Sequence, residues 1–172
     1  MSEKMILVLG GAASGKSAFA ENIIQHSGLD KVYIATARVW DDEMKAKVAQ
    51  HVTMRGGGWT TIDAPLEPAA ALRALPAGSA VLIDCATMWL TNHVMDETDI
   101  DAAQAQFLDG LRTARNMRVV VSNELGGGLV PDTAMGRRFR QLQGELNQRL
   151  AAQADTVVLV TAGLPSVLKG TL

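Results

Sequence analysis

The stretch MILVLGGAASGKS, residues 5–17, decides the fold. Its last eight residues, Gly10 to Ser17, satisfy the pattern G-x-x-x-x-G-K-S, in which the amides of a glycine-rich turn surround phosphate groups. The apolar run 5–9 before it has the character of a short strand, and a helical pattern begins at Lys16. This order predicts an α/β fold of the P-loop NTPase class, RecA-like, with a mostly parallel sheet and helices on both faces.

Short β-branched runs alternate with longer helical patterns along the rest of the chain. The expected strands are Ile6–Leu9, Val32–Thr36, Val81–Asp84, Arg118–Ser122 and Thr156–Thr161, with a weaker candidate at Thr60–Asp63. The expected helices are Lys16–His26, Asp42–Met54, Pro65–Leu75, Ile100–Ala114 and Asp132–Ala152. The last helix carries an apolar stripe that should pack on the sheet, formed by Met135, Phe139, Leu142, Leu146 and Leu150.

Bulk properties narrow the class of protein. A chain of 172 residues can bury a core without a metal or a disulfide, so we expect one domain spanning residues 1–172. Its 48% hydrophobic and 20% charged residues exclude a disordered or fibrous class, and the net charge of −2 argues against general binding to nucleic acid. No apolar run approaches the ~20 residues of a membrane span. With no secretory leader and a lone Cys85, we expect a cytoplasmic protein.

The phosphate loop supplies the first candidate site residues. Lys16 would neutralise the outer phosphates of a nucleotide, and the Ser17 hydroxyl is placed to bind Mg²⁺. A companion carboxylate is expected at the end of another buried strand, and Asp84 occupies such a place, so we predict that Ser17 and Asp84 hold the metal. Two alternatives stay open. The loop could be a plain turn between a strand and a helix, and Asp84 could be the N-cap of the next helix.

A second group of residues follows the second expected strand. Met44, Val48 and His51 are spaced i, i+4 and i+7, which predicts that His51 lies on the inward face of its helix. Lys47 and Arg55, each four residues from it, add positive charge. From spacing alone, His51 is either a hydrogen-bonded core residue or a nucleophile for the α-phosphorus of a nucleotide. Of the other histidines, His26 is interpreted as a cation at the C-terminus of a helix, and His93 as a surface residue of a loop or helix.

Several segments along nearly the whole chain, taken together with their order, resemble one family. This is the family of bifunctional adenosylcobinamide kinase / adenosylcobinamide-phosphate guanylyltransferases of cobalamin biosynthesis. The first half contributes Gly10 to Ser17, Tyr33 to Ala37, Asp41 to Met44, His51, Arg55, Trp59, Asp84-Cys85, Thr87 and Leu90 to Asn92. The second half contributes Asn123 to Gly126, Gly128, Val130-Pro131, Phe139-Arg140, Gly144, Asn147-Gln148 and Leu150.

The resemblance implies a two-step enzyme. It phosphorylates the aminopropanol hydroxyl of adenosylcobinamide with a nucleoside triphosphate, ATP or GTP, and then transfers GMP from GTP to that phosphate. The resemblance further implies that GMP travels on His51 and that the protein is a homo-oligomer, a ring-like trimer. The implied nucleotide contacts are Gly10, Gly11, Ala12, Ala13, Ser14, Gly15, Lys16, Ser17, Thr36, Ala37, Arg38, Val52, Thr53, Met54, Arg55, Asp63 and Asp84.

The chain departs from the family pattern at a few positions. Ala13 stands where an arginine is common, Gly56 where a proline is frequent, and Asp63 and Asp84 where glutamate also occurs. These changes affect the finer nucleotide contacts. Two rival functions remain, a single-function P-loop kinase for a small metabolite and a nucleotide-sensing binding protein. A covalent guanylyl adduct would exclude the first, and turnover of cobinamide with GTP would exclude the second.

Overall fold

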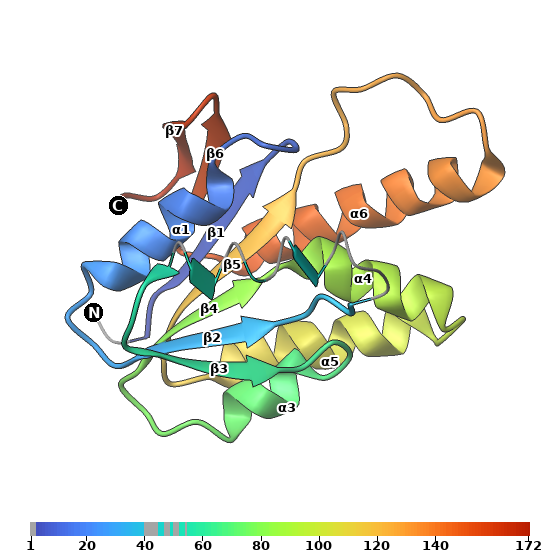
Figure 1. Ribbon diagram of the computed structural model, residues 1–172. Helices are drawn as coiled ribbons and strands as arrows, with labels where there is room; N and C mark the ends of the chain where they lie inside the picture. Colours follow the sequence, from blue (N-terminus) through green and yellow to red (C-terminus); the bar gives the residue numbers. More distant parts are fainter. Residues whose placement is uncertain (1–2, 40–44, 47–48, 50–51, 54) are drawn as a thin grey trace.

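The computed structural model describes residues 3–39, 45–46, 49, 52–53 and 55–172. Within these residues, seven strands form one sheet in the order β3-β2-β4-β5-β1-β6-β7 (Figure 1). The strands are β1 (Met5–Gly10), β2 (Lys31–Ala35), β3 (Trp59–Asp63), β4 (Ala80–Asp84), β5 (Met117–Asn123), β6 (Thr156–Thr161) and β7 (Leu164–Lys169). The helices are α1 (Lys16–Gln25), α3 (Pro68–Arg73), α4 (Ala86–Met95), α5 (Ile100–Thr113) and α6 (Ala134–Gln153).

The strands β1 to β6 pair in parallel, and β7 pairs antiparallel with β6 at one edge of the sheet. Because the parallel strands point the same way, the loops that follow them gather at one edge of the sheet, where ligands bind in open α/β folds. In this order β5 lies between β1, which leads into the phosphate loop, and β4, which ends at Asp84.

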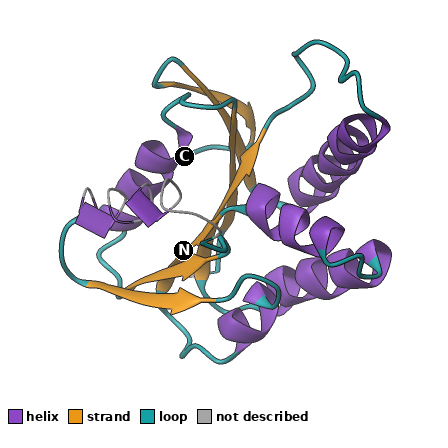
Figure 2. Ribbon diagram, turned by 45° about the vertical axis from the view of Figure 1, so that its right-hand side comes forward, coloured by secondary structure: helices purple, strands orange, loops and turns teal. Residues whose placement is uncertain are grey.

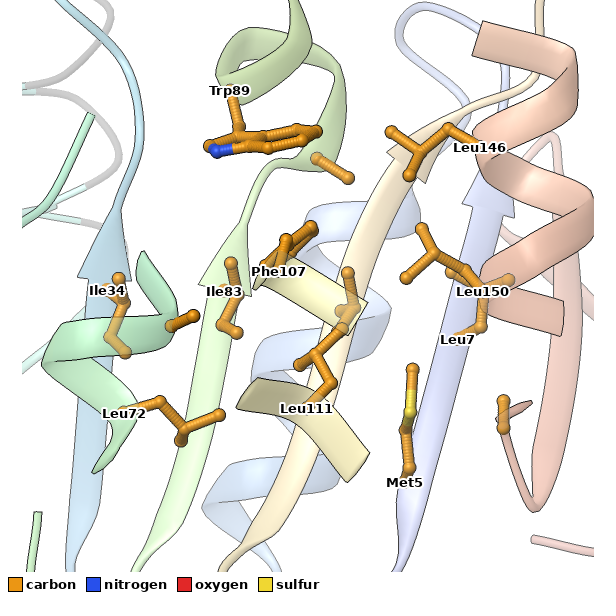
Figure 3. Packing of buried hydrophobic residues seen from close by; sticks show 14 of the residues in the cluster. Met5, Leu7, Ile34, Leu72, Ile83, Trp89, Phe107, Leu111, Leu146 and Leu150 are labelled. Atoms are coloured by element: carbon orange, nitrogen blue, oxygen red, sulfur yellow. The ribbon is translucent and has the colours of Figure 1, made fainter. Parts of the chain in front are cut away.

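Helices cover both faces of the sheet (Figure 2). Alternate residues of β1 divide between the two faces, because side chains of a strand point to opposite sides in turn. Ile6 and Val8 pack with the α1 residues Ala20 and Ile24. Met5 and Leu7 belong to the larger core under the other helices (Figure 3), together with Leu72, Trp89, Phe107, Leu111, Leu146 and Leu150.

The strand prediction is confirmed, including the weak candidate at Thr60–Asp63, which is part of β3. Two elements were not anticipated, the helix α4 and the exposed strand β7. The expected helix Asp42–Met54 lies partly outside the described residues. The remaining expected helices are present, and none of their ends differs from the expected position by more than three residues.

Two of the predicted side-chain positions are wrong. Met135 was expected to pack on the sheet, yet it is 67% exposed in the first turn of α6, while Leu146 and Leu150 further along the same stripe are fully buried. His93 was expected at the surface, yet it is buried on α4. Its ring nitrogens lie 2.8 Å from the Thr98 hydroxyl and 3.1 Å from the Leu66 carbonyl oxygen. The surface prediction failed because it did not anticipate that this side of α4 packs against the segment that contains Leu66.

Candidate functional site

The phosphate loop joins the end of β1 to the start of α1. Gly15 is the N-cap of α1 with φ 91°, and no side chain caps the helix there. The amides of the first turn are therefore available to phosphate oxygens, at the end of the helix that carries partial positive charge. Glycine is also needed at position 10, where a Cβ would collide with the Ser14 hydroxyl and lie 2.7 Å from the Val160 carbonyl oxygen.

The turn between β6 and β7 supports this loop from the side. Ala162 and Gly163 both have positive φ, 52° and 78°. The Gly163 amide donates to the Ser14 carbonyl oxygen at 2.8 Å. A Cβ on Gly15 would lie 3.1 Å from the Gly163 Cα. The C-terminal hairpin thus packs directly against the backbone that is expected to hold phosphate.

Lys16 and Ser17 begin α1 and face a cavity of about 400 Å³. The Lys16 ammonium donates to the Gly11 carbonyl oxygen at 3.0 Å, which places the positive charge over the loop. Asp84 lines the same cavity from the end of β4 and accepts a hydrogen bond of 3.3 Å from the Tyr33 hydroxyl. A lysine, a hydroxyl and a carboxylate from two separate strand ends therefore share one site.

The structure tests the alternative interpretation of Asp84 as the N-cap of the next helix. The N-cap of α4 is Cys85, whose sulfur accepts a hydrogen bond from the Met88 amide at 3.4 Å. The N-cap interpretation of Asp84 is therefore wrong. The backbone at this point is held by Thr36, whose hydroxyl donates to the Cys85 carbonyl oxygen and accepts from the Cys85 amide, both at 2.7 Å.

Several of the predicted nucleotide contacts meet in this cavity. Among the described residues, those that line it are Lys16, Ser17, Ala37, Val52, Arg55, Asp63 and Asp84. Other predicted contacts lie elsewhere: Thr36 is fully buried behind Cys85, and Arg38 forms a bidentate ion pair with Asp96 at 2.7 and 2.8 Å. The exposed Thr53 hydroxyl donates to the Ala49 carbonyl oxygen at 3.0 Å. His51 and Met54 lie outside the described residues.

Arg55 is the centre of a buried cationic group that spacing alone did not reveal. Its guanidinium carbon lies 3.4 Å from the centre of the Tyr33 ring, and its side chain is only 4% exposed. Its Nε is 4.0 Å from the Glu21 carboxylate, which reaches across from α1. Within the described part of the chain, Arg55 Nε and Nη1 and Glu21 Oε1 have no hydrogen-bond partner. Buried donors of this kind are satisfied when a ligand supplies acceptors.

Burial dominates the acid–base behaviour of this group. Desolvation raises the pKa of Glu21 to about 7, although the nearby Arg55 cation opposes the shift. Burial and the Asp84 charge also raise the pKa of the Tyr33 hydroxyl, which therefore stays protonated as a donor to Asp84. The same two causes raise the pKa of Cys85 to about 12, so its thiol is protonated at neutral pH and is a poor nucleophile.

Asn123 is a further cavity residue that sequence reasoning did not place in the site. It ends β5, and its carbonyl oxygen accepts from the Asn147 side chain at 2.9 Å. Asn147 in turn accepts from the buried Ser122 hydroxyl at 2.6 Å and from Gln143 at 3.0 Å. The position of Asn123 at the end of a buried strand is the same signal that identified Asp84.

Comparison with solved structures supports the fold class. The flagellar accessory protein FlaH of Methanocaldococcus jannaschii aligns with a TM-score of 0.54 at 12% identity, covering 99% of this chain and 80% of that one. The RadB recombinase aligns with a TM-score of 0.53 at 15% identity, covering 92% and 74%. A type III secretion system ATPase aligns with a TM-score of 0.55 at 10% identity, covering 96% and 57%. The sheet is therefore of the RecA-like P-loop type, as predicted. In the described part of the chain, no helix combines the length and apolar character needed to cross a membrane.

Comparison of sequences identifies the family. The bifunctional adenosylcobalamin biosynthesis protein CobP of Pseudomonas aeruginosa is 41% identical over 167 residues, covering 95% of this chain and 96% of that protein. The CobU proteins of Escherichia coli and Salmonella typhimurium are 34% and 36% identical, each covering 96% of this chain and 99% of the relative. The family model for cobinamide kinase / cobinamide phosphate guanyltransferase matches residues 6–168. Lys16 and Ser17 of the phosphate loop lie on one cavity with Asp84 and Arg55. Because the family model matches residues 6–168, the chain belongs to the cobinamide kinase / cobinamide phosphate guanyltransferase family.

Proposed function

We propose that this chain, as one domain of residues 1–172, carries out both reactions of its family on adenosylcobinamide and uses His51 as the carrier of GMP. The observation that supports the proposal is the common cavity of Lys16, Ser17, Asp84 and Arg55. It combines the charges needed for phosphoryl transfer with a buried arginine that follows His51 by four residues.

In the kinase reaction the aminopropanol hydroxyl attacks the γ-phosphorus of ATP or GTP, the bond from that phosphorus to the β,γ-bridging oxygen breaks, a nucleoside diphosphate leaves, and the hydroxyl proton is released to water. Lys16 and the amides at the start of α1 stabilise the charge that develops on the phosphate oxygens. Ser17 and Asp84 offer a hydroxyl and a carboxylate on one cavity, and Mg²⁺ prefers such oxygen ligands. When bound there, Mg²⁺ would neutralise charge on the phosphate chain.

In the guanylyl transfer, a neutral His51 nitrogen attacks the α-phosphorus of GTP and pyrophosphate leaves. A phosphate oxygen of adenosylcobinamide phosphate then attacks the same phosphorus, the phosphorus–nitrogen bond breaks, and His51 is regenerated as adenosylcobinamide-GDP forms. The covalent intermediate divides one difficult displacement into two easier ones.

GTP labelled at the α-phosphate tests this assignment. Wild-type protein should retain label in a bond that is labile to acid and stable to base, and His51→Ala should lose the label and the guanylyl transfer but keep much of the kinase activity. His26→Ala is the matched control, because His26 is exposed at the end of α1 and its ring bonds only the Asn22 carbonyl oxygen in the described structure. Retention of label in His51→Ala would eliminate His51 as the carrier.

The assembly and location belong to the same proposal. The edge strand β7 exposes the apolar side chains Leu164, Val167 and Leu168, which are 73%, 45% and 59% exposed. An open apolar edge favours contact with another chain, which supports a homo-oligomer, with a trimer as the form to test. We also propose that the enzyme works in the cytoplasm. Light scattering of wild type and Val167→Asp would measure the assembly, and an unchanged mass would exclude this edge as the contact.

A further inference from the structure

The segment 124–133, which we name the acceptor loop, leaves the active site and stands away from the body of the molecule (Figures 1 and 2). It starts directly after Asn123, which lines the nucleotide cavity. Its first amide, that of Glu124, donates to the Gly10 carbonyl oxygen at 3.0 Å. The loop is therefore anchored beside the phosphate loop and ends at Thr133, the N-cap of α6.

The acceptor loop is held in shape although its tip is apolar. Leu129 and Val130 are 96% and 74% exposed. Arg140 donates to the carbonyl oxygens of Leu129, at 2.9 Å, and of Gly126, and Arg137 donates to those of residues 131 and 132, at 3.0 and 2.9 Å. Single exposed apolar residues are ordinary, but Leu129 and Val130 are adjacent, and the braced loop holds both exposed beside the active site, where they are available to a ligand.

A hollow adjoins the far end of the acceptor loop. It has a volume of about 440 Å³ and lies between the end of α4 and the first turn of α6, where Val94, Met135 and Arg138 line it. The helix α4 connects this hollow to the nucleotide cavity, because Met88 lines the cavity. Met88 and Val94 are six residues apart, or about 9 Å along the helix axis.

We propose, on the basis of the proposed function, that the corrin ring of the substrate docks on the acceptor loop and this hollow, with Leu129, Val130 and Met135 as its apolar contacts. A cavity of about 400 Å³ suits one ligand of nucleotide size, so the much larger corrinoid has to lie outside it and extend only its reacting arm inward. The roughly 9 Å along α4 is a distance that such an arm can span.

The chemistry of the surface matches a corrinoid. The ring presents an apolar face and methyl groups, which fit the leucine, valine and methionine side chains. Its rim carries amide groups, and the exposed residues Gly127 and Gly128 have no side chains of their own that would cover their peptide groups. A second copy of this chain is a less suitable occupant, because it would cover the side from which the acceptor enters.

The test is a steady-state comparison of the double variant Leu129→Ser/Val130→Ser with wild type. The KM for adenosylcobinamide should rise about tenfold or more, since two apolar contacts are lost, while the KM for ATP and the melting temperature stay unchanged. The variant Leu129→Met/Val130→Ile keeps apolar contacts and should stay close to wild type. Leu172→Ser is the matched control for loss of an exposed apolar residue, being 60% exposed at the C-terminus.

Three outcomes would overturn the proposal. The first is an unchanged KM for adenosylcobinamide in the double variant. The second is a loss of subunit association while the KM for adenosylcobinamide stays unchanged, which would assign the loop to a contact between copies of the chain. An equal rise in the KM of both substrates would mean that the loop acts on the nucleotide site. If the double variant fails to fold, Met135→Gln provides the same comparison from α6. Equilibrium dialysis of adenosylcobinamide, followed by its own absorbance, measures docking even where turnover is absent.

Discussion

Replacing Glu21 by glutamine should stabilise the protein at pH 8 and leave its stability at pH 4 unchanged. Burial raises the pKa of Glu21 from 4.5 in the unfolded chain to about 7 in the folded protein. The Glu21 carboxyl group therefore holds its proton more tightly in the folded than in the unfolded protein. As the pH rises from 4.5 to 7, the folded protein loses stability relative to the unfolded chain. Each pKa unit is worth 1.36 kcal/mol, so the full loss above pH 7 is about 3 kcal/mol at most. Glutamine has no proton to lose and avoids this cost.

The assay is the melting temperature of nucleotide-free protein as a function of pH. At pH 8 the Glu21→Gln variant should melt above wild type by roughly 6–12 °C at most, and the difference should vanish below pH 4.5. Glu67→Gln is the control, because Glu67 is exposed and its side chain caps no helix. If Glu21→Gln is instead destabilised at pH 8, the ion pair with Arg55 outweighs desolvation and the reasoning is refuted.

Four further substitutions test the site and the core. Lys16→Ala should weaken ATP binding and severely reduce kinase turnover at unchanged melting temperature, because in the described structure its ammonium bonds only one loop carbonyl; unaltered affinity would mean that the loop is only a turn. Asp84→Asn should raise the Mg²⁺ concentration for half-maximal activity, and an identical Mg²⁺ titration would exclude it as a ligand. Gly163→Val should cost about 1–3 kcal/mol in urea unfolding and weaken ATP binding, because the Gly163 amide bonds the phosphate loop. Gly28→Val, at a similar φ of 72° and with equally open space for a Cβ, should lose stability only. Trp89→Ala should cost about 3–5 kcal/mol in urea unfolding, because Trp89 is 1% exposed and packs 4.7 Å from the Phe107 ring centre; a loss below 1 kcal/mol would contradict this packing.

The parallel strands could be predicted because each buried strand contains a short apolar run with β-branched residues, as in residues 119–121. The strand β7 could not, because it contains Pro165, and all of its side chains are exposed, so it has no core-facing pattern. Its pairing with β6 at the sheet edge is what tolerates the proline. The helix α4 left a readable signal in the spacing of Ala86, Trp89, Leu90 and His93, but its N-cap is a cysteine, which is not a usual start signal.

The site was predictable where a motif or a strand end marked it, as for Lys16 and Asp84. Asp63 entered through family resemblance, whereas Arg55 was first noted for its spacing from His51 and became a nucleotide contact only through the resemblance; the cavity includes both. Glu21 carried no signal of its own, because its role depends on a helix packing that brings α1 to within 4.0 Å of Arg55. The exposure of Leu129 and Val130 also depends on how the loop leaves the sheet, which a local pattern does not encode.

The position of β5 between β1 and β4 sets the width of the phosphate site. Two spacings between neighbouring strands separate the phosphate-loop strand from the Asp84 strand, or roughly 9.5 Å. In the sheet register Asp84 pairs with Val121, and Val121 pairs with Val8. Asp84 therefore lies two residues before Gly10 along the strand direction, or about 6.6 Å. Backbone hydrogen bonds of the sheet fix both distances. Substitutions that line the cavity can therefore change which base or acceptor is preferred, but they leave the span between phosphate and carboxylate as it is.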